Sequence, residues 1–151
     1  ADVAFFLHEV PSYLDGRGDV LRETFAPFSV PVVLVKPDQG VSTGACYRLL
    51  DEMATPAPQV EPMLEALRIC DVPGALAAVA NNMEPAALQL APAIAEVFAF
   101  LQDSGACQAG PLLCGSGSCV CAFVGDLAVA ERLAAQAREH GWWACASTTL
   151  A

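Results

Sequence analysis

The sequence predicts an α+β domain, a ferredoxin-like split βαβ sandwich with an antiparallel sheet and a helical insertion. Three observations lead to this prediction. The apolar, β-branched run at 32–35 is typical of a buried strand. Several helical stretches follow it. From residue 112 onward the chain alternates as strand, turn, strand, helix and strand, so the complete order becomes β-α-(helices)-β-β-α-β.

The N-terminal part of the chain predicts a β-hairpin before the buried strand. Tyr13-Leu14 and Val20-Leu21-Arg22 are short strand-like runs, and the glycine-rich segment 15–19 between them is typical of a tight turn. Pro27 and Pro31 bracket a linker that leads into the strand at 32–35.

The middle of the chain predicts helices. Ser42 and Thr43 are suitable caps for a first helix over about 44–53. Three further helical stretches follow at 60–69, 72–80 and 85–101. Pro92 lies inside the last one, so we expect a kink or two shorter helices there.

The segment from residue 112 predicts a hairpin followed by a helix and a final strand. Asp126 caps the predicted helix at 127–140, and Gly141 ends it. The run 142–149 alternates as a strand, in which Trp142 and Trp143 are expected to pack in the core or on a sheet face.

The predicted hairpin contains the turn Gly115-Ser116-Gly117-Ser118, which has two interpretations. It is a simple reversal between two strands, or its backbone N–H groups converge on an anion. The local sequence favours the simple reversal. No Lys-Ser or Lys-Thr follows the glycines, so the turn is not a Walker A loop, and a strand rather than a helix follows, so it is not a dinucleotide fingerprint.

Composition limits the classes of partner. At 151 residues the chain is one domain by the usual size, and 55% of its residues are hydrophobic. The formal net charge is −10, with a single lysine, Lys36, which argues against a nucleic-acid partner. No apolar run reaches the roughly 18 residues of a membrane span. The apolar content therefore predicts an alanine-rich interior or a face that expects a partner.

Seven cysteines without a dense framework predict reduced thiols and a cytoplasmic location. Cys114, Cys119 and Cys121 lie close in sequence, but no CxxC pair occurs, and both histidines are remote. We expect no metal site and interpret the thiols as small core-filling side chains.

Several segments together resemble one family, the 4-diphosphocytidyl-2-C-methyl-D-erythritol kinases of the GHMP kinase superfamily. The N-terminal run resembles the family's G-A/S-D-V-P-F-F motif, and Cys114 to Val120 resembles its third motif, S-G-S-G-P/A-S/T-V. The matching segments occur in order: Ala1-Asp2-Val3-Ala4-Phe5-Phe6, Gly16-Arg17-Gly18-Asp19, Val41-Ser42-Thr43 with Tyr47, Asn81-Asn82-Met83-Glu84-Pro85-Ala86, Gly115-Ser116-Gly117, Gly141-Trp142-Trp143 and Thr148-Thr149-Leu150. The sequence departs from the motifs at Ala4, Asp19, Cys114 and Ser118.

The resemblance covers only the C-terminal half of such a kinase. The family's N-terminal half carries a catalytic lysine and the glycine-rich loop that wraps ATP phosphates, and neither motif occurs in this sequence. The resemblance therefore implies two parts: residues 1–28, the end of the missing N-terminal half plus the hairpin, and residues 29–151, the GHMP kinase C-terminal domain. ATP and Mg²⁺ are expected to bind the full-length enzyme and not this fragment tightly.

The resemblance also implies roles for individual residues. In the family, ATP phosphorylates a hydroxyl of a cytidine-diphosphate-linked methylerythritol, and positioning and charge stabilisation supply most of the catalysis. Asp2 matches the catalytic aspartate, the general base. Tyr47 matches the aromatic position that stacks on cytosine, with core packing as the alternative. Thr43, Gly115, Ser116 and Gly117 would bind the substrate's phosphates, although a simple helix cap is the alternative for Thr43.

Two other function classes remain open at this point. A non-catalytic, ferredoxin-like binding module would hold a small ligand or regulate a partner. Another GHMP kinase would act on a different alcohol, but the Asp-Val-Ala-Phe-Phe and Val-Ser-Thr segments resemble the cytidyl-substrate group. The fragment interpretation further predicts no activity by this chain alone, and self-association through the face that should contact the N-terminal half.

Overall fold

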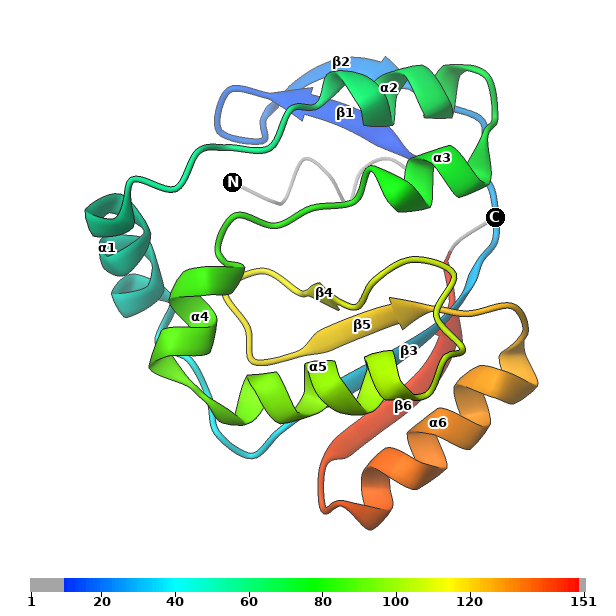
Figure 1. Cartoon of the computed structure of the whole chain (residues 1–151). Helices are drawn as coiled ribbons and strands as arrows, with labels where there is room; N and C mark the ends of the chain where they lie inside the picture. Colours follow the sequence, from blue (N-terminus) through cyan, green and yellow to red (C-terminus); the bar gives the residue numbers. More distant parts are fainter. Residues whose placement is uncertain (1–9, 150–151) are drawn as a thin grey trace.

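The computed structural model describes residues 10–149, which form a sheet flanked by helices and a separate layer that contains a β-hairpin (Figure 1). The predicted catalytic residue Asp2 lies outside the described residues. Within the described part of the chain, no helix is long and apolar enough to cross a membrane.

A four-stranded antiparallel sheet in the order β4-β5-β3-β6 forms the centre of the fold. Its strands are β3 (Pro31–Lys36), β4 (Leu112–Leu113), β5 (Val120–Phe123) and β6 (Trp143–Thr148). β3 is central because its β-branched residues suit burial on both sides: Val33 lies opposite Ala122 of β5 and Ala146 of β6. The strand order and the antiparallel pairing confirm the predicted split βαβ sandwich.

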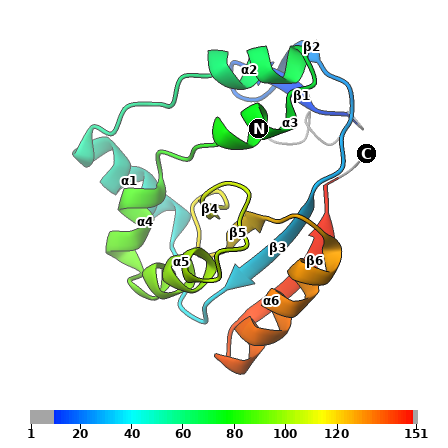
Figure 2. The ribbon, with the colours of Figure 1, turned by 45° about the vertical axis from the view of Figure 1, so that its right-hand side comes forward.

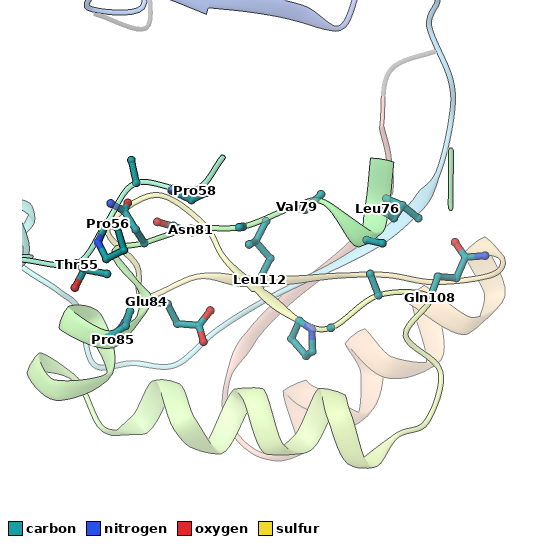
Figure 3. Close-up of a pocket in the computed structure, with 17 residues that line it drawn as sticks. Thr55, Pro56, Pro58, Leu76, Val79, Asn81, Glu84, Pro85, Gln108 and Leu112 are labelled. Atoms are coloured by element: carbon teal, nitrogen blue, oxygen red, sulfur yellow. The ribbon is translucent and has the colours of Figure 1, made fainter. Parts of the chain in front are cut away.

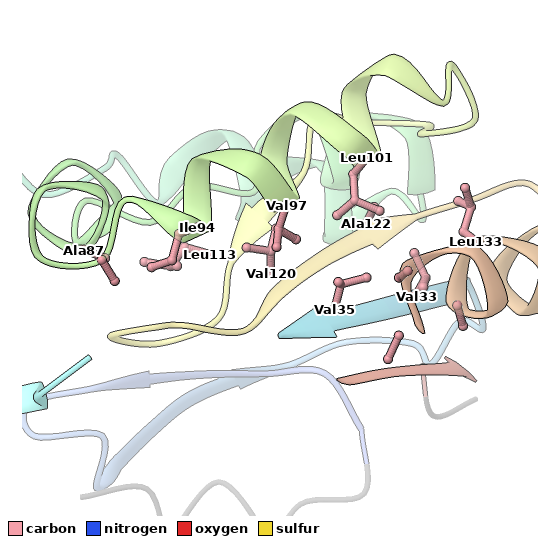
Figure 4. Packing of buried hydrophobic residues seen from close by; sticks show 14 of the residues in the cluster. Val33, Val35, Ala87, Ile94, Val97, Leu101, Leu113, Val120, Ala122 and Leu133 are labelled. Atoms are coloured by element: carbon pink, nitrogen blue, oxygen red, sulfur yellow. The ribbon is translucent and has the colours of Figure 1, made fainter. Parts of the chain in front are cut away.

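One face of the sheet carries the hydrophobic core. Helices α5 (Ala93–Asp103) and α6 (Leu127–Glu139) cover this face (Figures 1 and 4). Successive strand residues point to opposite faces, so alternate residues of β3 and β5 meet the helices. The largest fully buried side chains of this cluster are Val33, Val35, Val120, Ile94, Val97, Leu101, Leu113 and Leu133. Burying one such side chain contributes roughly 1.5–3 kcal/mol.

Four helices form the predicted insertion between β3 and α5. They are α1 (Thr43–Met53), α2 (Glu61–Arg68), α3 (Val72–Ala77) and α4 (Glu84–Leu90). α1 packs against α4, and α2 packs against α3. Pro92 lies between α4 and α5, which confirms the prediction of two shorter helices, because proline lacks the N–H that a continuous helix needs.

The hairpin of β1 (Ser12–Asp15) and β2 (Val20–Thr24) packs with α2 and α3 in a layer apart from the sheet (Figure 2). Arg68 of α2 joins this layer through two hydrogen bonds to the Glu23 carboxylate, at 2.6 and 3.0 Å. These bonds hold the pKa of Glu23 below its usual value. The predicted boundary between residues 28 and 29 falls between β2 and β3 and stays a prediction.

The two neighbouring tryptophans differ in their surroundings. Trp142 stacks on His140 with ring centroids 4.9 Å apart and meets the edge of Phe100, as predicted for a packed side chain. Trp143 is 56% exposed, so its predicted packing in the core is wrong. It begins β6 directly before the buried Ala144 of the core cluster, so strand alternation points its side chain to the opposite face of the sheet.

Candidate functional site

The turn between β4 and β5 is a closed reversal of four residues, Gly115 to Ser118. The Cys114 N–H donates to the Cys119 carbonyl at 2.8 Å, and the Gly117 N–H donates to the Cys114 carbonyl at 3.0 Å. Gly115 has φ +57° and Gly117 has φ +88°, in the left-handed region that favours glycine. The predicted hairpin reversal is therefore confirmed.

The two glycines face different surroundings. A Cβ atom on Gly115 would meet no atom of residues 10–149 within 4 Å, so no described residue fills the space beside this glycine. A Cβ atom on Gly117 would lie 3.1 Å from Leu113 and 3.4 Å from Ile94, so this glycine lies tightly against the core. The turn is anchored on its Gly117 side and accessible on its Gly115 side, where a ligand could approach the backbone.

The beginning of α1 contacts this turn. The Thr43 Oγ1 and Ser116 Oγ atoms lie 2.9 Å apart, within hydrogen-bond distance. Ser42 is the N-cap of α1 and accepts from the Ala45 N–H at 3.4 Å, which confirms its predicted capping role. Two segments 73 residues apart in sequence thus bring two hydroxyls together at a helix N-terminus. Unpaired N–H groups and the helix dipole favour an anion at such a place.

Asn81 holds the turn from its other side. Its Nδ2 donates to the Leu113 carbonyl at 2.9 Å and to the Gly115 carbonyl at 2.8 Å. Its Oδ1 accepts from the Met83 N–H at 2.9 Å, which fixes the amide orientation. Asn81 belongs to a segment that resembles a family motif, but no role was predicted for this residue, so its positioning role was missed. The asparagine pair directly before a Glu-Pro helix start was a second signal.

Tyr47 lies one helical turn after Thr43 on α1, so the two side chains share one side of the helix. The Tyr47 side chain is 55% exposed. This exposure excludes the alternative of core packing and leaves the ring free to stack on a flat partner. The structure thus joins Thr43 to Ser116 directly and puts Tyr47 on the same side of α1 as Thr43.

A basic side chain lies at the base of the turn. Lys36, the only lysine in the chain, ends β3. Val35 pairs with Val120, so Lys36 comes next to Cys119, and its ammonium acts to lower the pKa of that thiol. Among residues 10–149, no group of three or more His, Cys, Asp or Glu side chains is arranged to hold a metal ion.

A cleft of about 700 Å³ borders the turn through Asn81 and β4 (Figure 3). Leu112 lies on the side of β4 opposite the buried Leu113 and lines this cleft together with Leu76 and Val79. Glu84 contributes the cleft's carboxyl group, and burial raises the pKa of that group above its usual range. The cleft therefore combines apolar and hydrogen-bonding groups and adds no strong positive charge.

Comparisons with known proteins show which family this chain resembles. The family model described as "GHMP kinases C terminal" matches residues 63–141. The 4-diphosphocytidyl-2-C-methyl-D-erythritol kinase of Pelotomaculum thermopropionicum is 33% identical over 139 residues, which cover 91% of this chain and 48% of that protein. The kinase of the same name from Desulfitobacterium hafniense is 33% identical over 151 residues, which cover 99% of this chain and 52% of that protein.

A solved structure shows the same similarity. The crystal structure of a 4-(cytidine 5′-diphospho)-2C-methyl-D-erythritol kinase superposes with a TM-score of 0.75 at 32% identity, over 98% of this chain and 53% of that one. The chain spans about half the length of the curated relatives it matches. The family model covers more than half of the chain, so this chain belongs to the GHMP kinase family, within its C-terminal domain.

Proposed function

We propose that this chain is the C-terminal, substrate-binding part of an ATP-dependent kinase that phosphorylates a hydroxyl of 4-diphosphocytidyl-2-C-methylerythritol in non-mevalonate isoprenoid biosynthesis. The observation that carries the proposal is the 2.9 Å contact between Thr43 and Ser116. It joins the Val-Ser-Thr segment to the Gly-Ser-Gly turn, the two described segments that resemble the phosphate-binding motifs of these kinases. The names of the relatives support the choice of substrate.

In this proposal the turn and the start of α1 bind the substrate's diphosphate or the phosphoryl group in transfer. Gly115 leaves room for the oxygens, Ser116 and Thr43 offer hydroxyl donors, and the N-terminus of α1 adds partial positive charge. These contributions are electrostatic and positional, which is what phosphoryl transfer requires. The open side of Gly115 and the paired hydroxyls fit a phosphate group.

Tyr47 and Asp2 complete the proposed site. The exposed Tyr47 ring stacks on the cytosine, a contact worth roughly 1–3 kcal/mol. Asp2 accepts the proton of the reacting hydroxyl as general base. ATP would supply the phosphoryl group and Mg²⁺ would serve as its counter-ion, and the N-terminal half of the enzyme, outside this chain, would hold both. The chain alone is then inactive, and its face for that half leads to self-association.

The proposal is tested by producing the chain joined to its upstream gene segment and measuring ATP consumption with the cytidyl substrate. We expect turnover by the joined protein and none by residues 1–151 alone. Asp2→Asn should lower kcat by about 10²–10⁴-fold, the usual effect of removing a general base. Tyr47→Ala should raise KM by about 5–150-fold, as loss of stacking predicts.

Ser147→Ala is the matched control, because Ser147 is exposed on β6, away from the turn. It should keep normal turnover. Absence of turnover in a folded joined protein would contradict the proposed reaction and favour the non-catalytic binding module. Full turnover by Asp2→Asn would contradict the role of Asp2 alone.

A further inference from the structure

Three cysteines border the turn on a single face of the sheet. In the β4–β5 pairing Leu112 lies opposite Cys121 and Leu113 opposite Val120, so the next pair toward the turn is Cys114 and Cys119. Cys119 and Cys121 are two positions apart on one strand and therefore share a face, and Cys114 joins that face across the pair. This is the face opposite the buried Leu113 and Val120.

The three thiols lie close enough to shift one another's pKa. Cys119 lowers the pKa of Cys114, but Cys121 and burial raise it by more, so the pKa of Cys114 rises to about 12. Cys114 and burial raise the pKa of Cys119, whereas Cys114 lowers the pKa of Cys121. The positive charge of Lys36 opposes the rise at Cys119.

The backbone geometry of the Cys114–Cys119 pair suits a covalent bond. Residues directly opposite each other in an antiparallel ladder have Cα atoms about 4.5–5.5 Å apart, within the range of about 4.4–6.8 Å that disulfides span. The 2.8 Å bond from the Cys114 N–H to the Cys119 carbonyl fixes this pairing. Cys121 lies opposite Leu112 and Leu34 instead, and about 7 Å along the strand from Cys119.

Access also distinguishes the pairs. Cys114 and Cys119 are half-buried, whereas Cys121 is 6% exposed. An oxidant in solution therefore reaches Cys114 and Cys119 before it reaches Cys121.

We propose that Cys114 and Cys119 form a reversible disulfide that closes the four-residue turn, with a low-molecular-weight disulfide as the oxidant. The Cys114 thiolate attacks one sulfur of oxidised glutathione, which releases one glutathione thiolate and leaves a mixed disulfide on Cys114. The Cys119 thiolate, next to Lys36, then attacks the Cys114 sulfur and releases the second glutathione. Two protein thiols are oxidised, one disulfide is reduced to two glutathione molecules, and the two thiol protons are taken up by the leaving thiolates.

The bond would link the two ends of the segment that carries Gly115, Ser116 and Gly117. Its formation depends only on the hairpin. Its effect on phosphate binding rests on the proposed function, so the test measures the bond itself and not kinase activity.

The test incubates the 151-residue chain in glutathione buffers of increasing oxidised fraction, blocks remaining thiols with N-ethylmaleimide, and digests with chymotrypsin. Cleavage after Leu113 and Phe123 releases the peptide 114–123, which contains these three cysteines and no other. We expect this peptide to lose two hydrogens and to carry one maleimide, on Cys121. Dithiothreitol should restore three maleimides.

Single variants identify the bonded pair. Cys121→Ser should keep the disulfide, and Cys114→Ser and Cys119→Ser should lose it, with circular dichroism confirming that each variant folds. Cys145→Ser is the matched control, since Cys145 is a half-buried thiol of β6 that pairs with Leu34 rather than with a cysteine. The proposal is overturned by three maleimides at every redox ratio, by a persistent glutathione adduct, or by a bond that survives in Cys119→Ser.

Discussion

Replacing Asn81 with alanine tests how the turn is held. The substitution removes donors to the Leu113 and Gly115 carbonyls, at 2.9 and 2.8 Å, and the acceptor of the Met83 N–H, at 2.9 Å. A net hydrogen bond is worth about 0.5–1.5 kcal/mol, so the three together predict a loss of about 2–4 kcal/mol in the free energy of unfolding. Urea denaturation followed by the fluorescence of the two tryptophans measures this change.

Two variants separate the hydrogen bonds from other effects of the substitution. Asn82→Ala is the matched control, because no side-chain hydrogen bond of Asn82 is found among residues 10–149, and it should cost less than about 0.5 kcal/mol. Asn81→Asp keeps the acceptor for Met83 but directs a carboxylate at two carbonyls, so it should cost at least as much as alanine. If Asn81→Ala lowered the free energy of unfolding by less than about 0.5 kcal/mol, or if Asn81→Asp were as stable as the unchanged chain, Asn81 would not hold the turn.

Three further predictions concern the turn and the hairpin layer. Gly115→Ala should lower the free energy of unfolding by about 1–2 kcal/mol, because the backbone at this position is left-handed. Gly117→Ala should lower it by more, because its Cβ would also meet Leu113 at 3.1 Å. Equal losses on urea denaturation would contradict this. Ser118→Ala should leave stability unchanged or raise it by about 1 kcal/mol, because its buried Oγ has no hydrogen-bond partner in the part of the chain that the structure describes; a clear loss would mean that this hydroxyl is satisfied. Arg68 lowers the pKa of Glu23 from 4.5, so their pairing stabilises the fold above the unfolded carboxyl's pKa and is lost as pH falls through the lower folded value. Glu23→Gln should therefore weaken the acid dependence of the urea midpoint, and an unchanged dependence would argue against the pairing.

Local patterns in the sequence were sufficient for the secondary structure and the fold class. The β-branched run at 32–35 predicted β3, Pro92 predicted the division of α4 from α5, and Asp126 with Gly141 predicted both ends of α6. These signals act within a few residues, so the sequence displays them directly. The strand order followed because few arrangements satisfy β-α-β-β-α-β connections.

Long-range contacts could not be predicted in this way. The meeting of Thr43 with Ser116 depends on how α1 docks beside the β4–β5 turn. The positioning role of Asn81 was not predicted, because its partners are backbone carbonyls that any sequence would offer. Trp143 was expected to pack in the core or on a sheet face, but it lies on the face opposite the core, where its side chain stays exposed. The role of Asp2 rests on resemblance alone and stays a prediction.

The central claim is that the start of α1 and the β4–β5 turn act together in binding substrate phosphate. The most direct measurement is a double-mutant cycle of Thr43→Ala and Ser116→Ala on kcat/KM for the cytidyl substrate, in the protein joined to its upstream segment. If both hydroxyls serve one site, each single variant lowers kcat/KM, and the double variant departs from additivity by about 0.5–3 kcal/mol. Strict additivity, or normal kcat/KM in both single variants, would contradict the claim.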